Sequence, residues 1–348
     1  MSPRRVLIAP LNWGLGHATR CIPLIQHILA LGHEPILASD GLSGHVLRKA
    51  FPQLSFLALP SYNIQYPIKW RALYWWKKAK DLEKVFSNEH GVIRNYIDAN
   101  PVDLIISDNR YGVYYEHIPS VIITHQLTFP FPVGIREIVC RKVDQWIAPF
   151  DQCWIPDIPG PNNLSGMLSS RSIKVPVTFI GPMSRFVALD VKKEYDLAVV
   201  LSGPEPYRQI LLNDLLQVLG KSDRKMVWIL GDPNTKLPPI GDSEVYSYLG
   251  GRALNEMLCA SDIVLSRSGY SSIMDYYRLN RKAVLVPTPG QPEQAYLAKR
   301  HGKRPEFATV GNRLIGLLEQ LEHLAPLSPA LPELYANETK IIALQEWL

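Results

Sequence analysis

Arg267, Gly269 and Asp275 stand in the segment of the sequence whose residue types and spacing point most directly to chemistry. If a strand ends just before Arg267 and a helix begins near Tyr270, the unpaired N–H groups of that helix face an anion above the sheet. Gly269 would allow the tight turn, and Arg267 would add a positive charge. The Asp275 carboxylate could accept hydrogen bonds from two ribose hydroxyls. The segment predicts a nucleotide site, although a structural turn with a surface arginine and aspartate fits it equally well.

A second glycine-rich turn, with Gly14 and Gly16, precedes His17 near the N-terminus. It lies between a predicted strand at 6–9 and a helical segment. Because Thr19 stands where a dinucleotide-binding fingerprint has its third glycine, the match to that fingerprint is partial. An imidazole here would project over the carboxyl edge of the sheet, where open α/β folds bind ligands. His17 is therefore an acid–base candidate, with helix capping or turn stabilisation as the alternative.

Polar residues follow two further predicted strands of the first half. Asp108 comes after the strand at 104–106, and His125 after the strand at 121–123. Both fall at the carboxyl edge of the predicted sheet, where we expect an acceptor molecule to bind. Either side chain could instead cap a helix or hold a loop.

Strand and helix patterns alternate along the 348 residues, which predicts an α/β fold with two Rossmann-like domains facing a central cleft. Strands are expected at 6–9, 35–38, 55–57, 104–106, 121–123, 197–201, 226–229, 245–248, 263–265 and 284–286. A region rich in proline and glycine, 155–182, marks the approach to the domain boundary. We therefore expect domains at 1–182 and 183–330, followed by a helix at 331–348 that crosses back to the first domain.

The composition is that of an ordinary globular protein, with 47% apolar and 20% charged residues. No apolar run reaches the roughly 20 residues of a membrane span, and none fits a signal peptide, which predicts a cytoplasmic protein. The four cysteines are scattered and indicate reduced thiols. A net charge of +5 suits an anionic ligand or membrane surface, but its basic residues are too dispersed to indicate nucleic acid.

With these motifs the sequence resembles the GT-B glycosyltransferases, and among them family 28, whose best-known member is the N-acetylglucosaminyltransferase of lipid II synthesis. That family has an Arg-Ser-Gly turn followed, eight residues after the arginine, by an acid that binds the ribose. Arg267, Ser268, Gly269 and Asp275 hold these positions here. The family usually has glutamate at the position of Asp275, so the acidic side chain is shorter here.

The resemblance extends to two other segments of the second half. After the next strand the family carries a proline and a polar loop ending in glutamine that touches the donor sugar, which implies that Glu293 and Gln294 contact the sugar. The turn containing Ser202 and Gly203 resembles the family's second phosphate-side glycine turn, although a purely structural turn fits nearly as well.

The resemblance implies transfer of a sugar from a UDP-sugar to an acceptor that the sequence does not identify, for which it suggests a lipid-linked or cell-envelope molecule. His17 would act as base, while Arg267 and the amides of Ser268 and Gly269 stabilise the departing diphosphate. No Asp-x-Asp motif occurs, which predicts a site that needs neither metal nor cofactor. The Gly-Leu-Gly-His turn at 14–17 also looks like the UDP-sugar hydrolase of pseudaminic acid biosynthesis.

Two rival functions remain open at this point. A non-catalytic nucleotide-sugar sensor would keep Arg267 and Asp275 but would not need His17. A dinucleotide oxidoreductase would use the first glycine turn and leave the motif of the second half unexplained. In addition, the aromatic and basic stretch 69–78 fits peripheral contact with the inner face of a membrane, or an amphipathic helix packed on its own domain.

Overall fold

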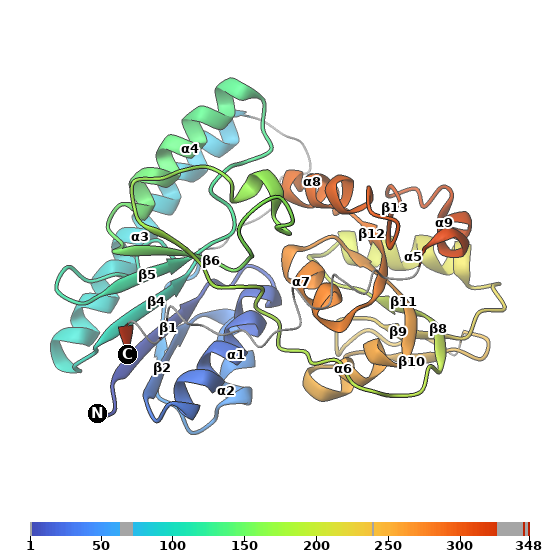
Figure 1. Ribbon diagram of the computed structural model, residues 1–348, viewed down its shortest axis with the longest axis horizontal. Coiled ribbons are helices and arrows are strands. Elements are labelled where there is room, and N and C mark those ends of the chain that lie inside the picture. The colour runs from blue at the N-terminus through green and yellow to red at the C-terminus, as the bar shows by residue number, and fades with distance from the viewer. Residues whose placement is uncertain (1, 63–71, 239, 326–343, 345–346) are drawn as a thin grey trace. The chain divides into compact units, whose positions relative to one another are not determined.

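The computed structural model describes residues 2–62, 72–238, 240–325, 344 and 347–348, without the side chains of 72–79. The chain divides into two compact units, Met1–Met183 with Thr339–Leu348, and Ser184–Glu338. Each unit is built on one parallel sheet with helices on its faces (Figure 1). Because the faces of such sheets are covered, their strands are continuous apolar runs, as the sequence predicted.

The first unit holds a seven-stranded sheet in the order β3-β2-β1-β4-β5-β6-β7. Its strands are β1 (Arg5–Pro10), β2 (Glu34–Ser39), β3 (Phe56–Ala58), β4 (Leu104–Asp108), β5 (Ser120–Ile123), β6 (Gln152–Ile155) and β7 (Val177–Phe179). Its helices are α1 (Leu15–Ala30), α2 (Gly41–Ala50), α3 (Ala72–Ala99), α4 (Val133–Ile147) and the short 3₁₀ turn Gly166–Leu168.

Successive residues of β1 point to opposite faces of the sheet and enter two different cores. Val6 and Ile8 pack with Leu24 of α1, whereas Leu7 packs with Ile93 of α3. All of these side chains are fully buried. The central strand is therefore clamped between helices, which makes it a rigid base for the loop that follows it.

The last residues of the chain belong to the first unit. Leu344 is fully buried in the core that contains Val6 and Ile8. The carbonyl oxygen of Trp347 accepts a hydrogen bond from Arg4 Nη1 at 2.9 Å. The helix predicted at 331–348 otherwise lies outside the described residues, apart from residues 344, 347 and 348.

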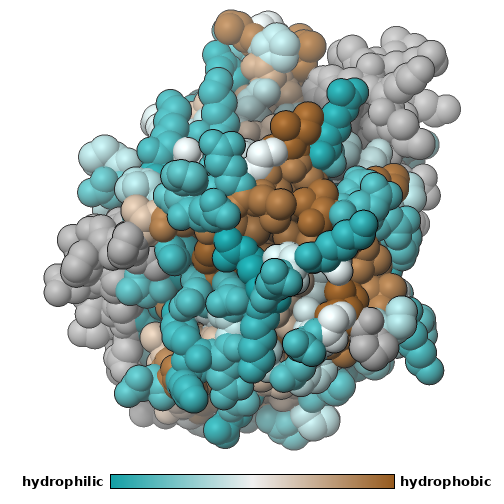
Figure 2. All heavy atoms as spheres, turned by 90° about the vertical axis from the view of Figure 1, so that its right-hand side faces the viewer, coloured by the Kyte–Doolittle hydropathy of each residue, from teal (hydrophilic) through white to brown (hydrophobic). Residues whose placement is uncertain are grey.

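The second unit holds a six-stranded sheet in the order β10-β9-β8-β11-β12-β13. Its strands are β8 (Tyr195–Val200), β9 (Met226–Ile229), β10 (Glu244–Tyr246), β11 (Ser261–Arg267), β12 (Lys282–Val286) and β13 (Phe307–Thr309). Its helices are α5 (Tyr207–Leu219), α6 (Gly251–Cys259), α7 (Tyr270–Leu279), α8 (Pro292–His301) and α9 (Leu317–His323). Figure 2 shows apolar atoms gathered on the end of this unit that carries α9, where Ile315 and Leu318 are exposed.

The ten strands predicted from the sequence all form, and three further strands were not predicted. Of these, β7 and β13 are three residues long and lie at sheet edges, so they carry too few residues for a recognisable period. The strand β6 overlaps the start of the region that we interpreted as the approach to a boundary. That region, 155–182, contains β7, which completes the sheet of the first unit, and it ends directly before the division between Met183 and Ser184.

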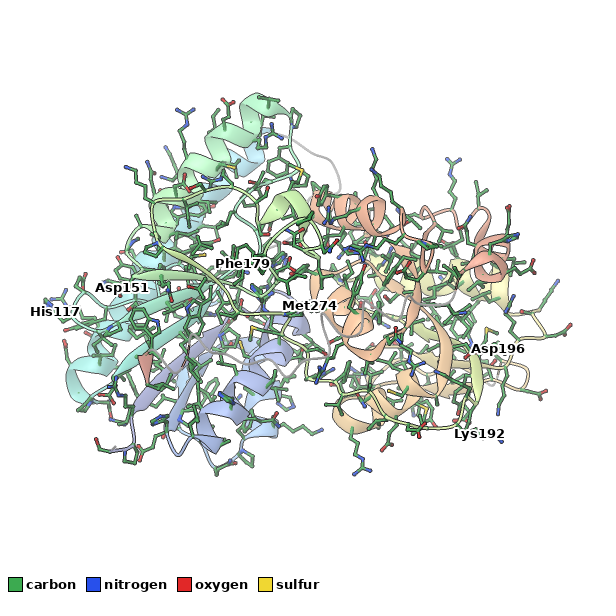
Figure 3. All side chains as sticks on the ribbon, viewed as in Figure 1. His117, Asp151, Phe179, Lys192, Asp196 and Met274 are labelled. Atoms are coloured by element: carbon green, nitrogen blue, oxygen red, sulfur yellow. The ribbon has the colours of Figure 1, made fainter. Side chains whose placement is uncertain are left out.

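Aspartates at the amino edges of both sheets have structural roles. Asp151, just before β6, accepts a hydrogen bond from the amide of Ser120 at 2.8 Å, and Asp196 in β8 accepts one from the amide of Lys225 at 2.8 Å. Figure 3 labels both aspartates at the ends of their sheets. These bonds fix the starts of neighbouring strands, so acidic residues free for chemistry must be sought at the opposite, carboxyl edges.

Candidate functional site

Both sheets have a point where the strand order reverses, between β1 and β4 in the first unit and between β8 and β11 in the second. Ligands of open α/β sheets bind outside the carboxyl ends of the strands at such switch points. His17 and Asp108 flank the first switch point. Ser202–Gly203 and the segment 267–269 flank the second. The sheet topology thus brings most of the predicted site residues to two defined places.

At the first switch point, His17 in the first turn of α1 hydrogen-bonds Asp108 at the end of β4. The Nδ1 and Oδ1 atoms are 2.9 Å apart. Asp108 is fully buried, whereas 13% of the His17 side chain is exposed. An ionised carboxylate can only accept a hydrogen bond, so the neutral His17 ring carries its proton on Nδ1. Its Nε2 atom is then left as a proton acceptor.

The Asp108 carboxylate also accepts hydrogen bonds from the guanidinium of Arg20, which lies one turn further along α1. The Arg20 Nε atom donates to Asp108 Oδ2 at 2.6 Å, and Nη2 donates to Oδ1. Burial acts to raise the pKa of Asp108, but Arg20 and His17 outweigh it and hold that pKa well below its usual value. The carboxylate is therefore a fixed negative charge bonded to His17 and Arg20, and its expected contact with an acceptor stays a prediction. The sequence analysis assigned no site role to Arg20, although its spacing of three from His17 places both on one helix face.

The surroundings of His17 favour its neutral form. Burial lowers the pKa of His17 below the ordinary histidine value, although the Asp108 carboxylate opposes this shift. Arg20 and His125 lower it further, so His125 lies close enough to act on the ring. His125 is 5% exposed. The structure thus brings together three of the predicted residues, His17, Asp108 and His125.

The loop before His17 is fixed by glycine geometry and by a polar network. Gly14, the N-cap of α1, has φ of 77°, a left-handed conformation that favours glycine. Gly16, by contrast, lies within the first turn of α1 and needs no special backbone conformation. Asn12 Nδ2 donates to Asp40 Oδ2 at 3.1 Å, and Asn12 Oδ1 accepts from the amide of Ser43 at 3.2 Å.

Arg110 connects that network to α3. Its fully buried guanidinium donates to Asp40 Oδ1 and, at 2.6 Å, to Glu89 Oε1. Glu89 in turn accepts from the Tyr62 hydroxyl at 2.7 Å. These bonds between buried groups stiffen the scaffold behind the His17 loop. No signal in the sequence pointed to this network, because its members are far apart in the chain.

At the second switch point, α7 begins where the sequence predicted, with Gly269 as its N-cap. The turn from β11 to α7 is as tight as predicted, with only two residues between them, but Gly269 has φ of −71°, a conformation open to any residue. A Cβ built at Gly269 would meet no atom within 4 Å. The glycine therefore leaves open space beside its own Cα at the start of α7, whose first amide groups have no partner within the helix.

The guanidinium of Arg267 is buried and hydrogen-bonds to groups of its own chain. It is 3% exposed, and its Nη1 atom donates to the carbonyl of Pro287 and to Asn312 Oδ1, both at 3.1 Å. Its Nη2 atom donates to the carbonyl of Tyr207 at 2.8 Å. Burial lowers the pKa of Arg267 to about 10. The side chain thus joins three loops around the switch point, and its contact with a diphosphate stays a prediction.

Asp275 lies on α7 beside two residues that the sequence analysis did not select. The Ser184 hydroxyl donates to Asp275 Oδ1 at 2.5 Å. Burial raises the pKa of Asp275 to about 7, although Ser184 and the positive charge of Arg185 oppose the shift. The guanidinium of Arg185 lies over the Phe186 ring at 4.8 Å. Among the described residues, Arg185 is the cation whose charge acts on Asp275, and no sequence motif pointed to it.

The loop after β12 is tied to the α7 turn through Gln294. The Ser268 hydroxyl donates to the Gln294 carbonyl at 2.9 Å, and Gln294 Oε1 accepts from the amide of Thr288 at 2.9 Å. Glu293 lies in the first turn of α8. On the other side, Gly203 has φ of 101° and its backbone approaches Thr288. Three loop ends therefore converge on the second switch point.

Three further features of the sequence analysis concern metal binding, membrane spans and the stretch 69–78. Among the described residues no group of three or more histidine, cysteine or acidic side chains is arranged to hold a metal ion. No helix in the described part of the chain is long and apolar enough to cross a membrane. Within the stretch 69–78, residues 69–71 and the side chains of 72–78 lie outside what the structure describes.

Comparison with known proteins gives a family match in the second unit and relatives along the whole chain. Residues 215–314 match the glycosyltransferase family 28 C-terminal domain, a range that includes Arg267, Asp275 and Gln294 but not Gly203. An uncharacterized glycosyltransferase of Methanosarcina mazei is 22% identical over 91% of this chain and 90% of its own length. One of Methanosarcina acetivorans is 21% identical over 88% and 84%.

Solved structures resemble both units. The glycotransferase of kitacinnamycin aligns with a TM-score of 0.68 at 15% identity over 100% of both chains. Acinetobacter baumannii MurG aligns with a TM-score of 0.59 at 13% identity, over 99% of this chain and 100% of its own. At such identities the likeness establishes the fold.

Proposed function

We propose that this chain, a glycosyltransferase of the GT-B fold similar to family 28, moves a sugar from a UDP-sugar to an acceptor hydroxyl without a metal ion. The first unit would serve the acceptor and the second the donor. The observation that carries the proposal is the His17–Asp108 pair at one switch point, with Asp275 and open helix amides at the other. Proton transfer and nucleotide binding are thereby assigned to different sheets.

In the proposed reaction the acceptor oxygen attacks the anomeric carbon of the donor sugar. Its proton passes to His17 Nε2 as the new C–O bond forms. The bond between the anomeric carbon and the diphosphate breaks, and UDP leaves with the bonding electron pair. Asp108 keeps the imidazole in the tautomer that can accept the proton and stabilises the imidazolium that results. The lowered pKa of His17 supports this role, because a base must be unprotonated before the reaction.

The donor would be held by groups of the second unit. The Asp275 carboxylate has about four lone-pair positions, so the bond from Ser184 leaves capacity for ribose hydroxyls. The amide groups at Ser268 and Gly269 face an anion in the manner of helix N-termini. Arg185 would supply the positive charge that we first assigned to Arg267. These groups are in place before the reaction, and such preorganised dipoles stabilise developing charge well.

A donor screen tests this proposal. The protein is incubated with a panel of UDP-sugars, with and without a bacterial lipid extract, and UDP and the sugar product are followed by mass spectrometry. We expect UDP release that depends on an added acceptor. Free sugar formed at full rate without any acceptor would instead identify the hydrolase that the Gly-Leu-Gly-His turn also resembles. The relatives named above are glycosyltransferases, which favours transfer.

We further propose a lipid-linked or cell-envelope acceptor, approached by a cytoplasmic protein at the membrane surface. Its support is the net charge of +5 and the aromatic and basic stretch 69–78. Sedimentation with anionic liposomes is the measurement, and a change of Trp75 and Trp76 to alanine should reduce it without altering UDP affinity. If the intact protein never sediments with such liposomes, the acceptor is not reached in this way.

A further inference from the structure

The Thr288 hydroxyl is a buried polar group that the site description leaves without a function. Thr288 follows β12 and is 2% exposed. Its Oγ1 atom has no hydrogen-bond partner among the described residues. Native structures rarely keep a buried hydroxyl unsatisfied, because its desolvation is then uncompensated. An exception of this kind needs an explanation, and a bound ligand is one.

The hydroxyl lies next to the glycine turn after β8. A Cβ built at Gly203 would have Thr288 Oγ1 at 4.0 Å, and no other described heavy atom that near. Because φ of Gly203 is 101°, a side chain there would also be strained. The backbone of one loop and the hydroxyl of another therefore lie close together at the second switch point.

Thr288 is also held firmly in position. Its amide donates to Gln294 Oε1 at 2.9 Å, while the carbonyl of the preceding Pro287 accepts from Arg267 Nη1 at 3.1 Å. The Gln294 carbonyl oxygen in turn accepts a hydrogen bond from the Ser268 hydroxyl. Gln294 and Arg267 thus act as positioning residues for Thr288, and a group held in this way loses little entropy when it binds.

We propose that the Thr288 hydroxyl donates a hydrogen bond to the diphosphate of the nucleotide-sugar donor, a residue-level assignment that rests on the proposed function. A diphosphate oxygen, rather than a sugar hydroxyl, is the partner because the neighbouring groups are N–H donors. The Ser202–Gly203 turn lies beside the hydroxyl, and Ser268, just before the open amides of α7, is tied to Thr288 through Gln294. Helix N-termini and glycine turns of this type suit anions.

The test compares Thr288→Val, which keeps the shape but removes the hydroxyl, with Thr288→Ser, which keeps the hydroxyl. Affinities for UDP and for uridine are measured by calorimetry. We expect Thr288→Val to weaken UDP binding about tenfold, as for one bond to a charged group, and to leave uridine binding unchanged. Thr288→Ser should bind UDP within about threefold of the parent. The melting temperature of ligand-free Thr288→Val should not fall, since the change removes an unsatisfied buried group.

Several results would overturn the assignment of Thr288 to the diphosphate. They can be distinguished from a failure of the proposed function. If Thr288→Val binds UDP normally while Asp275→Ala does not, the nucleotide site stands and Thr288 has no part in it. Equal losses for UDP and uridine would exclude a diphosphate contact. If the unchanged protein binds no UDP, the proposed function itself fails. Should Thr288→Val not fold, Thr288→Ala provides a second variant without the hydroxyl.

Discussion

The two switch points occupy the same topological position in their sheets, yet they are built in opposite ways. The first is a closed cluster of charges, in which Asp108 is fully buried and shared by His17 and Arg20. At the second, small residues and backbone groups border the site. Arg267, the cation of its sequence motif, donates hydrogen bonds to backbone carbonyl oxygens. Equivalent fold positions therefore do not imply equivalent chemistry.

The difference follows from what each place must do under the proposed function. A proton acceptor needs a fixed tautomer and a controlled pKa, and buried ionic partners supply both. A site for a diphosphate needs donors and space, and glycines with open helix amides supply these from the backbone alone. The following predictions are arranged to test this division, beginning with the largest effect.

The first prediction concerns His17, whose loss should affect turnover and not binding. His17→Ala should lower kcat by about 10² to 10⁴-fold, the usual contribution of a positioned acid–base group. UDP affinity should stay within about twofold, since the donor groups lie in the second unit. Steady-state kinetics and calorimetry give the two values. His27→Ala, on the same helix, is the matched control and should keep full activity.

Full turnover in a folded His17→Ala protein would remove the base from the mechanism. The first switch point would then be a structural cluster, and the proposed division between the two units would fail.

The second prediction concerns Asp108, which orients the His17 imidazole under the proposed mechanism. Asp108→Asn replaces the carboxylate by an amide that can donate to Nδ1, which favours the wrong tautomer, so kcat should fall by about 10²-fold or more. The variant also leaves Arg20 buried without the Asp108 charge, a change that typically destabilises by about 3–5 kcal/mol. Asp103→Asn is the control, because Asp103 precedes β4 at the opposite edge of the sheet and accepts from the Arg5 amide at 2.7 Å.

The pH profile provides a further readout for Asp108. In the parent protein kcat/KM should fall as the pH drops through the pKa of His17, which burial places below the ordinary value of 6.5. The Asp108 carboxylate favours the protonated ring, so its removal should move any remaining acid limb to lower pH. A limb that moves to higher pH would contradict the assigned interaction.

The sequence predicted ten of the strands and the turns that follow several of them, because hydrophobic period and glycine turns are local signals. It did not predict the strand order that creates the two switch points. It did not predict the use of each side chain. Arg267 was expected at the diphosphate, but its carbonyl partners are at Tyr207 and Pro287, which only the folded chain brings near. Arg185 was missed for the same reason, since its position beside Asp275 depends on how the segment after β7 runs. Long-range polar pairing has no periodic signature.

The third prediction tests that exchange of roles between the two arginines. Arg185→Ala should weaken UDP binding about tenfold and leave the melting temperature of the ligand-free protein nearly unchanged. Arg267→Ala should chiefly lower that melting temperature, because two carbonyls and Asn312 lose their donor. Calorimetry and thermal unfolding distinguish the two. If a folded Arg267→Ala protein loses more UDP affinity than Arg185→Ala, the assignment from the sequence motif is the correct one.

The smallest expected effect concerns the pH dependence of stability at Asp275. Its pKa in the fold is about 7, above the ordinary aspartate value, so the folded state favours the protonated form. The stability that this contributes is fully present below the unfolded-state pKa of about 4 and is lost as the pH rises through 7. An asparagine side chain does not titrate, and Asp275→Asn should therefore raise the melting temperature by a few degrees at pH 8 and by less at pH 5.

The same variant should weaken UDP binding, since an amide is a poorer acceptor for ribose hydroxyls than a carboxylate. A gain in stability together with a loss of affinity is what a binding group held in an unfavourable ionised form produces. The exposed Asp223, changed to asparagine, is the control and should show no such pH-dependent gain. If Asp275→Asn is instead less stable than the parent at pH 8, the carboxylate contributes to the fold through its bond with Ser184. The second switch point would then depend on a buried charge in the same way as the first, and the contrast between them would be lost.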